Sequence, residues 1–457
     1  MNTKLKSVNE IPGSLGLPIL GNLIEAFRYQ ELFYWQRHWQ YGKIFKVAFF
    51  GEKYVLLIGA KANRWVLKDG AEKLSARLGM KTLKPIVGEG FLLLKDGAEH
   101  RTSRRLILPI FHQQAIASYF DTMKSIVESA VVDWGKKGTI NLNDELRKLT
   151  LLVAVRIFLG SEKTAEIDRV CEWFNILMAK ERTAIVQWDL PFTARGQGQA
   201  ARRKLVDYVR QTIRSRQERG DLDNAQDVLG LLLHTVDEDG KKFTENQVID
   251  QAIGFLFAAH ETTATLMSWL LFELGNRPEW QERIRQQYRE VVGDGSIELA
   301  HLRQLSQMTH LIREGERLYP PVGFIIRGVL EDIEVDGYHI PAGWNVIASP
   351  MFTHRLPEIY AEPDKFDPDR FAPPREEDSK QPYSLIGFGG GAHSCIGVEF
   401  AKMEMKLILG ILLDNYDLVS DPLQDGVEYP VRKFVTTVPK LTTKLTPAKL
   451  ESSVMSI

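Results

Sequence analysis

The residues with the clearest chemistry lie in one glycine-rich segment, Phe388-Gly389-Gly390-Gly391-Ala392-His393-Ser394-Cys395-Ile396-Gly397. Cys395 is one of two cysteines in 457 residues. Because glycines let a backbone fold back on itself, neighbouring amides can point at the sulfur and stabilise a thiolate that ligates a metal. The apolar run from Val398 to Leu413 predicts a helix whose positive N-terminal end lies beside this cysteine. The competing interpretation is a buried, inert cysteine next to a glycine-rich turn.

A second group of polar residues, Ala258-Ala259-His260-Glu261-Thr262-Thr263, lies inside an apolar segment. Thr244 and Gln247 have the spacing of a capping box, and Pro278 limits the other end. We therefore predict a helix of about thirty residues, about 45 Å long. A carboxylate and hydroxyls buried without partners would cost free energy, and threonine can open a helix locally and make room for a small ligand. A solvated polar stripe is the alternative, which the apolar flanks disfavour.

Two further pairs have helical spacing. His100 and Arg104 are four residues apart and share one face of a predicted helix; a solvated basic face is the ordinary interpretation. Glu314 and Arg317 are three apart, and Pro320-Pro321 must end their helix. Such a pair alone is weak evidence of function, since exposed ion pairs contribute only ~0–1 kcal/mol.

The elements that must position these residues follow from hydrophobic patterns. Two runs rich in Phe, Val, Tyr and Ile, between Ile44 and Gly59, predict a β-hairpin. Short helices are expected within Gly70–Leu83, and residues 114–235 predict mainly helix, including a basic amphipathic helix from Arg195 to Arg219. Strands are expected between Val431 and Leu445.

The composition restricts the class of protein. Hydrophobic residues make up 44% and the net charge is −1, from 58 basic and 59 acidic side chains, so no global field attracts nucleic acid. Two distant cysteines exclude a disulfide framework and a four-cysteine zinc site, which favours a reducing compartment. We find no signal peptide and no run of roughly 18 uncharged apolar residues. A soluble, cytoplasmic, monomeric protein is expected.

The string F-x-x-G-x-H/R-x-C-x-G resembles the haem-thiolate loop of the cytochrome P-450 monooxygenases. The central helix resembles the oxygen-activation segment of that family, A/G-G-x-D/E-T-T, with Ala259 where glycine is typical. The resemblance extends over residues 11–445. It implies a single, mainly α-helical domain with small β-sheets, flanked by tails at 1–10 and 446–457. Haem b would lie between the long central helix and the helix that follows Cys395.

The resemblance also implies a role for individual residues. Cys395 would be the axial ligand of the haem iron, and Glu261 and Thr262 would pass protons to bound dioxygen. The other residues expected at the haem are His100, Arg104, Ala258, Arg327, Phe388, Gly391, His393 and Gly397. The residues expected to form a structural network are Glu314, Arg317 and Arg370. The residues expected to line the substrate pocket are Ala259, Val322, Gly323, Phe324, Ile325, Phe434 and Val435.

The implied reaction is hydroxylation of a C–H bond with dioxygen. The apolar pocket candidates favour a lipophilic substrate, and the Pro-Pro-Val-Gly string with the following arginine resembles retinoic-acid hydroxylases of cyanobacteria and animals. A retinoid or related terpenoid is our first expectation and a long-chain fatty acid the second. Electrons would come from a separate ferredoxin or flavoprotein, docked where Arg105, Lys402 and Lys406 offer positive charge.

Three other functions compete with this one. A haem-thiolate isomerase or dehydratase and a peroxide-driven hydroxylase would need no reductant, but both usually lack the acid–threonine pair formed here by Glu261 and Thr262. A haem sensor or carrier would bind haem without turnover.

Overall fold

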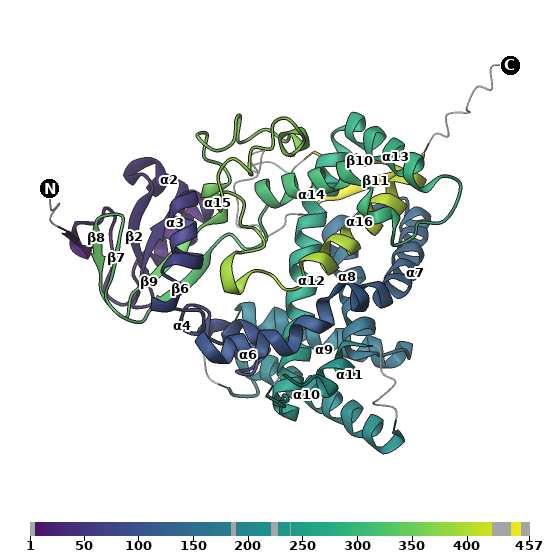
Figure 1. Ribbon diagram of the computed structural model, residues 1–457, viewed down its shortest axis with the longest axis horizontal. Helices are drawn as coiled ribbons and strands as arrows, with labels where there is room; N and C mark the ends of the chain where they lie inside the picture. Colours follow the sequence, from purple (N-terminus) through teal and green to yellow (C-terminus); the bar gives the residue numbers. More distant parts are fainter. Residues whose placement is uncertain (1–4, 184–188, 221–226, 238, 423–439, 449–457) are drawn as a thin grey trace.

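The structure of the protein, a computed structural model, describes residues 5–183, 189–220, 227–237, 239–422 and 440–448. Most of the chain is helical and the sheets are small, which confirms the predicted fold class (Figure 1). The α-helices of the described residues are α1 (Leu23–Tyr29), α2 (Glu31–Tyr41), α3 (Ala60–Arg64), α4 (Ala76–Gly79), α5 (Lys84–Val87), α6 (Gly97–Ile107), α7 (Gln113–Lys137), α8 (Leu142–Leu159), α9 (Thr164–Thr183), α10 (Ala194–Arg219), α11 (Val228–His234), α12 (Glu245–Gly275), α13 (Pro278–Val292), α14 (Ser306–Leu318), α15 (Pro350–Thr353) and α16 (Val398–Asn415).

The strands within the described ranges form three small sheets. They are β1 (Lys6–Ser7), β2 (Ile44–Phe49), β3 (Glu52–Leu57), β4 (Leu74–Ser75), β5 (Thr139–Asn141), β6 (Ile325–Val329), β7 (Ile333–Val335), β8 (Tyr338–Ile340), β9 (Asn345–Ala348), β10 (Tyr416–Ser420) and β11 (Thr442–Pro447). The largest sheet has the order β2-β3-β9-β6-β4, and the two others are β1-β8-β7 and β10-β11-β5. The expected hairpin is confirmed as β2 and β3, which pair antiparallel around Gly51.

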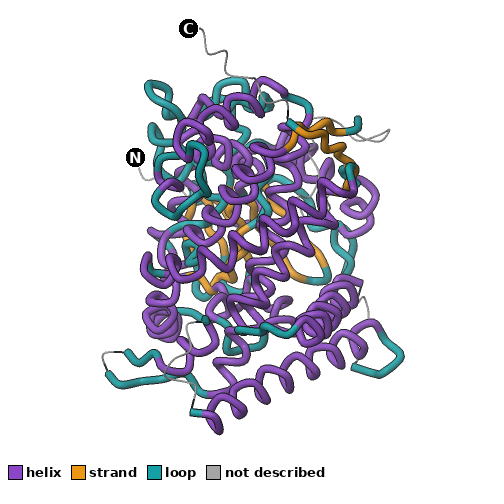
Figure 2. Tube along the Cα trace, turned by 90° about the vertical axis from the view of Figure 1, so that its right-hand side faces the viewer, coloured by secondary structure: helices purple, strands orange, loops and turns teal. Residues whose placement is uncertain are grey.

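The main hydrophobic core lies among the helices. One cluster joins buried apolar residues of α7, α8, α12, α14 and α16, and two smaller clusters lie against the sheets. α12 packs along α8, whereas α9 and α10 pack on each other. Figure 2 shows the strands gathered in two regions of a molecule that is otherwise built from helices. α12 and α16 also contact each other, so the two helices that carry the candidate chemistry share one core.

α12 begins and ends where the sequence predicts. The Gln247 amide donates to the Thr244 hydroxyl at 3.3 Å, and the Thr244 amide donates to Gln247 Oε1 at 2.9 Å. The helix contains 31 residues, and Pro278 starts the next helix. Every residue from 263 to 275 is buried. A helix so enclosed can hold a polar group at a fixed depth inside the protein.

The short helices expected within Gly70–Leu83 are confirmed at Ala71–Lys73, Ala76–Gly79 and Lys81–Leu83, but Leu74 and Ser75 between them form the unpredicted strand β4. Ser75 pairs with Gly328 of β6, more than 250 residues later in the chain. The Ser75 hydroxyl also accepts from the Leu78 amide at 2.9 Å and so begins the short helix α4. Local periodicity cannot predict β4, because the strand with which it pairs, β6, is distant in sequence.

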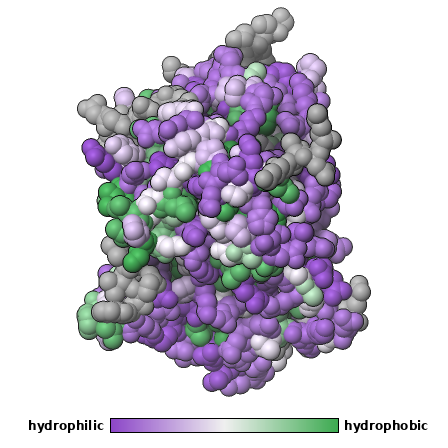
Figure 3. Space-filling view, turned by 90° about the vertical axis from the view of Figure 1, so that its left-hand side faces the viewer, coloured by the Kyte–Doolittle hydropathy of each residue, from purple (hydrophilic) through white to green (hydrophobic). Residues whose placement is uncertain are grey.

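Both ends of the described chain join sheets. β1 pairs with β8, and β11 continues through Thr446 and Pro447. Within the described residues, no helix combines the length and the apolar character needed to cross a bilayer. Figure 3 shows a mainly hydrophilic face with hydrophobic areas toward its left edge. The large hydrophobic side chains that are exposed near the N-terminus include Ile19, Phe27 and Phe50.

Candidate active site

The cysteine loop is folded by its own backbone. The Gly389 amide donates to the Ile386 carbonyl at 2.9 Å, and the Cys395 amide donates to the Phe388 carbonyl at 2.8 Å. Gly391 has a positive φ of 63°, and a Cβ there would collide with the backbone carbonyl of Leu67. Only glycine fits this close approach. The turn brings Cys395 to the N-terminus of α16, as the sequence predicts.

Cys395 and Ala258 are accessible although both lie on elements that pack into the main core. The surface of Cys395 is accessible to solvent. Its surroundings nevertheless raise the pKa of its thiol through burial, whereas the Gly397 amide and Arg104 lower that pKa. Ala258 is likewise exposed, although it lies midway along a helix in which most residues are buried. An accessible thiol and an accessible side of α12 inside a helical core indicate an internal space between Cys395 and Ala258. We call this inferred space the recess; it is of the kind that a ligand fills.

A cluster of basic residues borders the cysteine loop. Arg104 of α6 donates through Nη1 to the Ser394 carbonyl at 2.8 Å and through Nη2 to the Ser394 hydroxyl at 3.2 Å. The rings of His100 and His393 stack with their centroids 3.8 Å apart. Burial, with nearby arginines, lowers the pKa of His100 to about 4 and that of His393 to about 3. Both imidazoles are therefore neutral at pH 7.

Arg327 is a buried cation beside these histidines. Its Nη1 donates to the Ile326 carbonyl at 2.9 Å, and among the described residues no carboxylate lies within ion-pair distance of its guanidinium. Burial lowers the pKa of Arg327 to about 10, and the more distant Asp96 raises it. A buried charge that lacks a counter-ion is unfavourable, so this position suits an anionic ligand group.

The polar residues of α12 interact with α8. Glu261 forms an ion pair with Arg147, and the two side chains are 15% and 29% exposed. The Thr150 hydroxyl lies 3.2 Å from His260 Nδ1 and donates to the His260 carbonyl at 3.1 Å. No local pattern in the sequence singles out Arg147, which is 114 residues from Glu261; the packing of α8 on α12 brings the two together.

Thr262 bonds within its own helix. Its hydroxyl donates to the Ala258 carbonyl at 2.6 Å, the carbonyl of the residue that is exposed in the recess. Threonine thus interacts with the preceding turn, as expected from its position. Ala259 is partly buried and packs against the main core, so its methyl group occupies space that a glycine would leave open.

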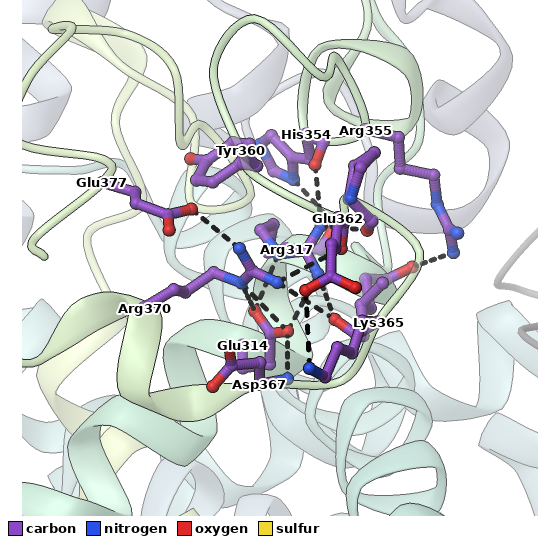
Figure 4. A network of polar contacts seen from close by, with 12 residues as sticks. Glu314, Arg317, His354, Arg355, Tyr360, Glu362, Lys365, Asp367, Arg370 and Glu377 are labelled. Atoms are coloured by element: carbon purple, nitrogen blue, oxygen red, sulfur yellow. Dashed lines mark hydrogen bonds and ion pairs between the residues drawn. The ribbon is translucent and has the colours of Figure 1, made fainter.

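The structure brings Glu314, Arg317 and Arg370 together in a fully buried network (Figure 4). Arg317 binds Glu314 through two hydrogen bonds of 2.7 and 2.8 Å. Arg370 donates to the same carboxylate at 3.1 Å and to Glu377 at 2.7 Å. The Asp367 amide donates a further bond of 2.7 Å to Glu314. Each charge is therefore paired and hydrogen-bonded, the condition under which buried ions are tolerated.

The expectation that Lys406 offers surface charge is wrong. Lys406 is buried, and its Nζ donates to the Leu302 carbonyl at 2.7 Å; burial lowers its pKa to about 8. Arg105 and Lys402 lie at the surface, with Asp237 and Glu399 as their respective partners at 3.8 and 3.0 Å. The apolar pattern predicted that Lys406 lies on the helix after Cys395. It did not show that other parts of the chain cover the side of α16 that carries Lys406.

The pocket candidates are spread over different environments. Val322 is exposed and Gly323 partly buried, whereas Ile325 is buried in the core beneath the largest sheet. The Phe324 ring packs at 4.9 Å from the Tyr34 ring in another cluster. The last two candidates, Phe434 and Val435, lie outside the described residues.

The family model for Cytochrome P450 matches residues 11–446. The chain belongs to the cytochrome P450 family. A cytochrome P450 of Synechocystis sp. is 31% identical over 423 residues, 93% of this chain and 94% of the relative. A sterol 14alpha-demethylase of Mycolicibacterium vanbaalenii is 30% identical over 79% of this chain and 81% of its own. A solved structure of retinoic acid-bound cyanobacterial CYP120A1 superposes with a TM-score of 0.86 at 29% identity, covering 97% of this chain and 100% of that one.

This membership makes the chain a monooxygenase whose cofactor is haem b. The residues of the recess fit that group. Cys395 presents an accessible thiol at a helix N-terminus, where a thiolate is stabilised. Arg327 is a buried cation without a carboxylate partner in the described chain, which suits a propionate. The exposed face of α12 at Ala258 offers a small side chain beside which a flat macrocycle can lie.

Proposed function

We propose that this cytochrome P450 hydroxylates a lipophilic small molecule and that Cys395 is the axial ligand of its haem iron. The observation that carries the proposal is an accessible Cys395 at the N-terminus of α16, in a loop bordered by Arg104 and by the stacked rings of His100 and His393. His100, His393, Arg104 and Arg327 would hold the propionate side of the haem. Bound haem with a thiolate ligand supplies the oxidising chemistry by favouring O–O cleavage.

The protein residues would supply protons at the distal side. Thr262 holds its hydroxyl at the turn that opens on the recess. Glu261 lies one residue away, at a position that is partly exposed and held by Arg147. In the proposed path, a proton would move from the Glu261 carboxyl through ordered water to the Thr262 hydroxyl, which would pass a proton on toward dioxygen. The ion pair with Arg147 fixes the position of the Glu261 carboxyl.

A retinoid or related terpenoid is the proposed substrate, with a long-chain fatty acid second. The apolar character of Val322, Phe324 and Ile325 supports a lipophilic molecule, and the retinoic acid-bound relative supports the retinoid. A separate ferredoxin or flavoprotein would supply the electrons, with Arg105 and Lys402 as the exposed charges that remain candidates for its docking.

Titration of the purified ferric protein with all-trans retinoic acid tests the substrate. A saturable shift of the haem Soret band from low to high spin would show that the ligand displaces water from the iron. A thiolate-haem spectrum that does not move at any concentration would overturn the retinoid proposal, and palmitic acid would then be tested in the same way. Product formation that depends on both reductant and dioxygen would exclude a peroxide-driven reaction or an isomerase.

A further inference from the structure

A buried carboxyl group that takes no part in the Glu314 network lies against the cysteine loop. Glu316 of α14 is 7% exposed, and its Oε1 accepts from the Phe388 amide at 3.3 Å. The Gly387 amide is a second donor to the same carboxyl. A Cβ at Gly387 would lie 2.8 Å from Glu316 Oε1 and 3.0 Å from its Cδ. The start of the loop is thus packed directly on this side chain.

The contact with Phe388 extends to the cysteine itself. The Phe388 amide is held by Glu316, and the Phe388 carbonyl accepts from the Cys395 amide at 2.8 Å. Phe388 therefore links the Glu316 carboxyl to the backbone of Cys395. Any rotation of the Gly387–Phe388 peptide would break the bond to Glu316 and alter the path of the loop.

The ionised Glu316 carboxyl places a negative charge beside the loop that leads to Cys395. Burial raises the pKa of Glu316 itself to about 7, while the two loop amides, Arg313 and Lys402 counteract this by favouring the carboxylate. The hydrogen-bond donors and cations around the carboxyl therefore offset only part of the effect of burial, and Glu316 is partly ionised near pH 7.

We propose that Glu316 is a positioning residue for the thiolate ligand. Its carboxyl fixes the entrance of the cysteine loop, and its negative charge favours the oxidised over the reduced iron. This inference rests on the proposed ligation of haem iron by Cys395. Glu314 and Arg317 of the same helix face the buried ion network, whereas Glu316 faces the loop.

Two substitutions separate the hydrogen bonds from the charge. E316Q keeps an oxygen acceptor for the loop amides but removes the charge, whereas E316L removes both. The matched control is E404Q, because Glu404 is also a buried glutamate, lies on α16 and has no hydrogen-bond partner among the described residues. The measurements are the ferric–ferrous potential and the ratio of thiolate-ligated to thiol-ligated haem in the ferrous–carbonyl spectrum.

We expect E316Q to shift the potential to a more positive value while it keeps the thiolate-ligated spectrum. E316L lacks the charge as E316Q does but also lacks an acceptor for the loop amides, so its ratio of thiolate-ligated to thiol-ligated haem should be about tenfold lower than that of E316Q. E404Q should match the wild type in both. Potentials and ratios of E316Q and E316L that equal those of E404Q would overturn the proposal. Absence of any thiolate-haem spectrum in the wild type would instead overturn the proposed ligation.

A second test does not depend on E316L folding. G387A should displace the Glu316 carboxyl and lower the same spectral ratio. In an E316A background the added methyl group meets no carboxyl, so G387A should then change the ratio little, and the double-mutant cycle should show strong coupling. Equal effects of G387A in both backgrounds would contradict the assignment.

Discussion

Glu404 provides a quantitative test of how burial in this core changes the pKa of a carboxyl group. The residue is 1% exposed on α16, and neither carboxyl oxygen has a hydrogen-bond partner in the described structure. Burial raises its pKa from an ordinary value of 4.5 to about 8. The folded protein therefore keeps the Glu404 proton up to about pH 8, whereas the unfolded chain releases it near pH 4.5. Between these values unfolding releases a proton, so stability falls as pH rises.

The size of this effect follows from the two pKa values. Each pH unit between these two pKa values lowers the free energy of unfolding by about 1.4 kcal/mol. The total loss is about 3 kcal/mol at pH 7 and about 5 kcal/mol at pH 9. Replacing Glu404 by methionine, which has similar length and no ionisable group, removes the cost. We expect E404M to unfold with a free energy higher by these amounts, and to differ from the wild type by less than about 1.5 kcal/mol at pH 4.

Urea unfolding of the haem-loaded proteins at pH 4, 7 and 9, followed by tryptophan fluorescence, measures the difference. The control is E399M, since Glu399 lies on the same helix but is exposed and pairs with Lys402. A stability gain for E404M that is the same at pH 4 and pH 9 would refute the reasoning, because it would show that the Glu404 carboxyl is not kept protonated by burial.

Three further substitutions test other parts of the site. R370M leaves Glu314 and Glu377 with one cation fewer in a fully buried network and should lower the free energy of unfolding by about 3–5 kcal/mol; a loss below 1 kcal/mol by urea titration would contradict it. T262A should reduce product formed per dioxygen consumed by about 10²-fold or more, with hydrogen peroxide released instead; unchanged coupling would remove Thr262 from proton delivery. R327L should speed haem transfer to apomyoglobin by about tenfold or more, since a charge-assisted bond to a propionate is lost; an unchanged rate would mean that Arg327 does not bind the haem.

Local sequence patterns predict much of this structure because their causes are local. The capping box at Thr244 fixes the start of α12, and Gly391 is required where the loop touches the Leu67 backbone. Pro278 likewise begins a helix because its missing amide is not needed there. These features depend on a few neighbouring residues, so the sequence displays them directly.

Contacts between distant segments were not predictable in the same way. The Arg147–Glu261 pair and the Glu316–Phe388 bond join residues that are 114 and 72 positions apart. The burial of Lys406 depends on which helices cover α16, and β4 exists because β6 supplies its partner. A single sequence shows whether each of these residues is polar or apolar, but it does not show which of them are in contact in the folded protein.

The ferrous–carbonyl absorption spectrum tests the central claim, that Cys395 ligates the haem iron, most directly. The wild type and C171S should show the thiolate-ligated band, because Cys171 is only partly buried against the core and lies outside the recess lined by the cysteine loop. C395S should bind carbon monoxide without that band. A thiolate-ligated spectrum that persists in C395S would contradict the account and would require another ligand for the iron.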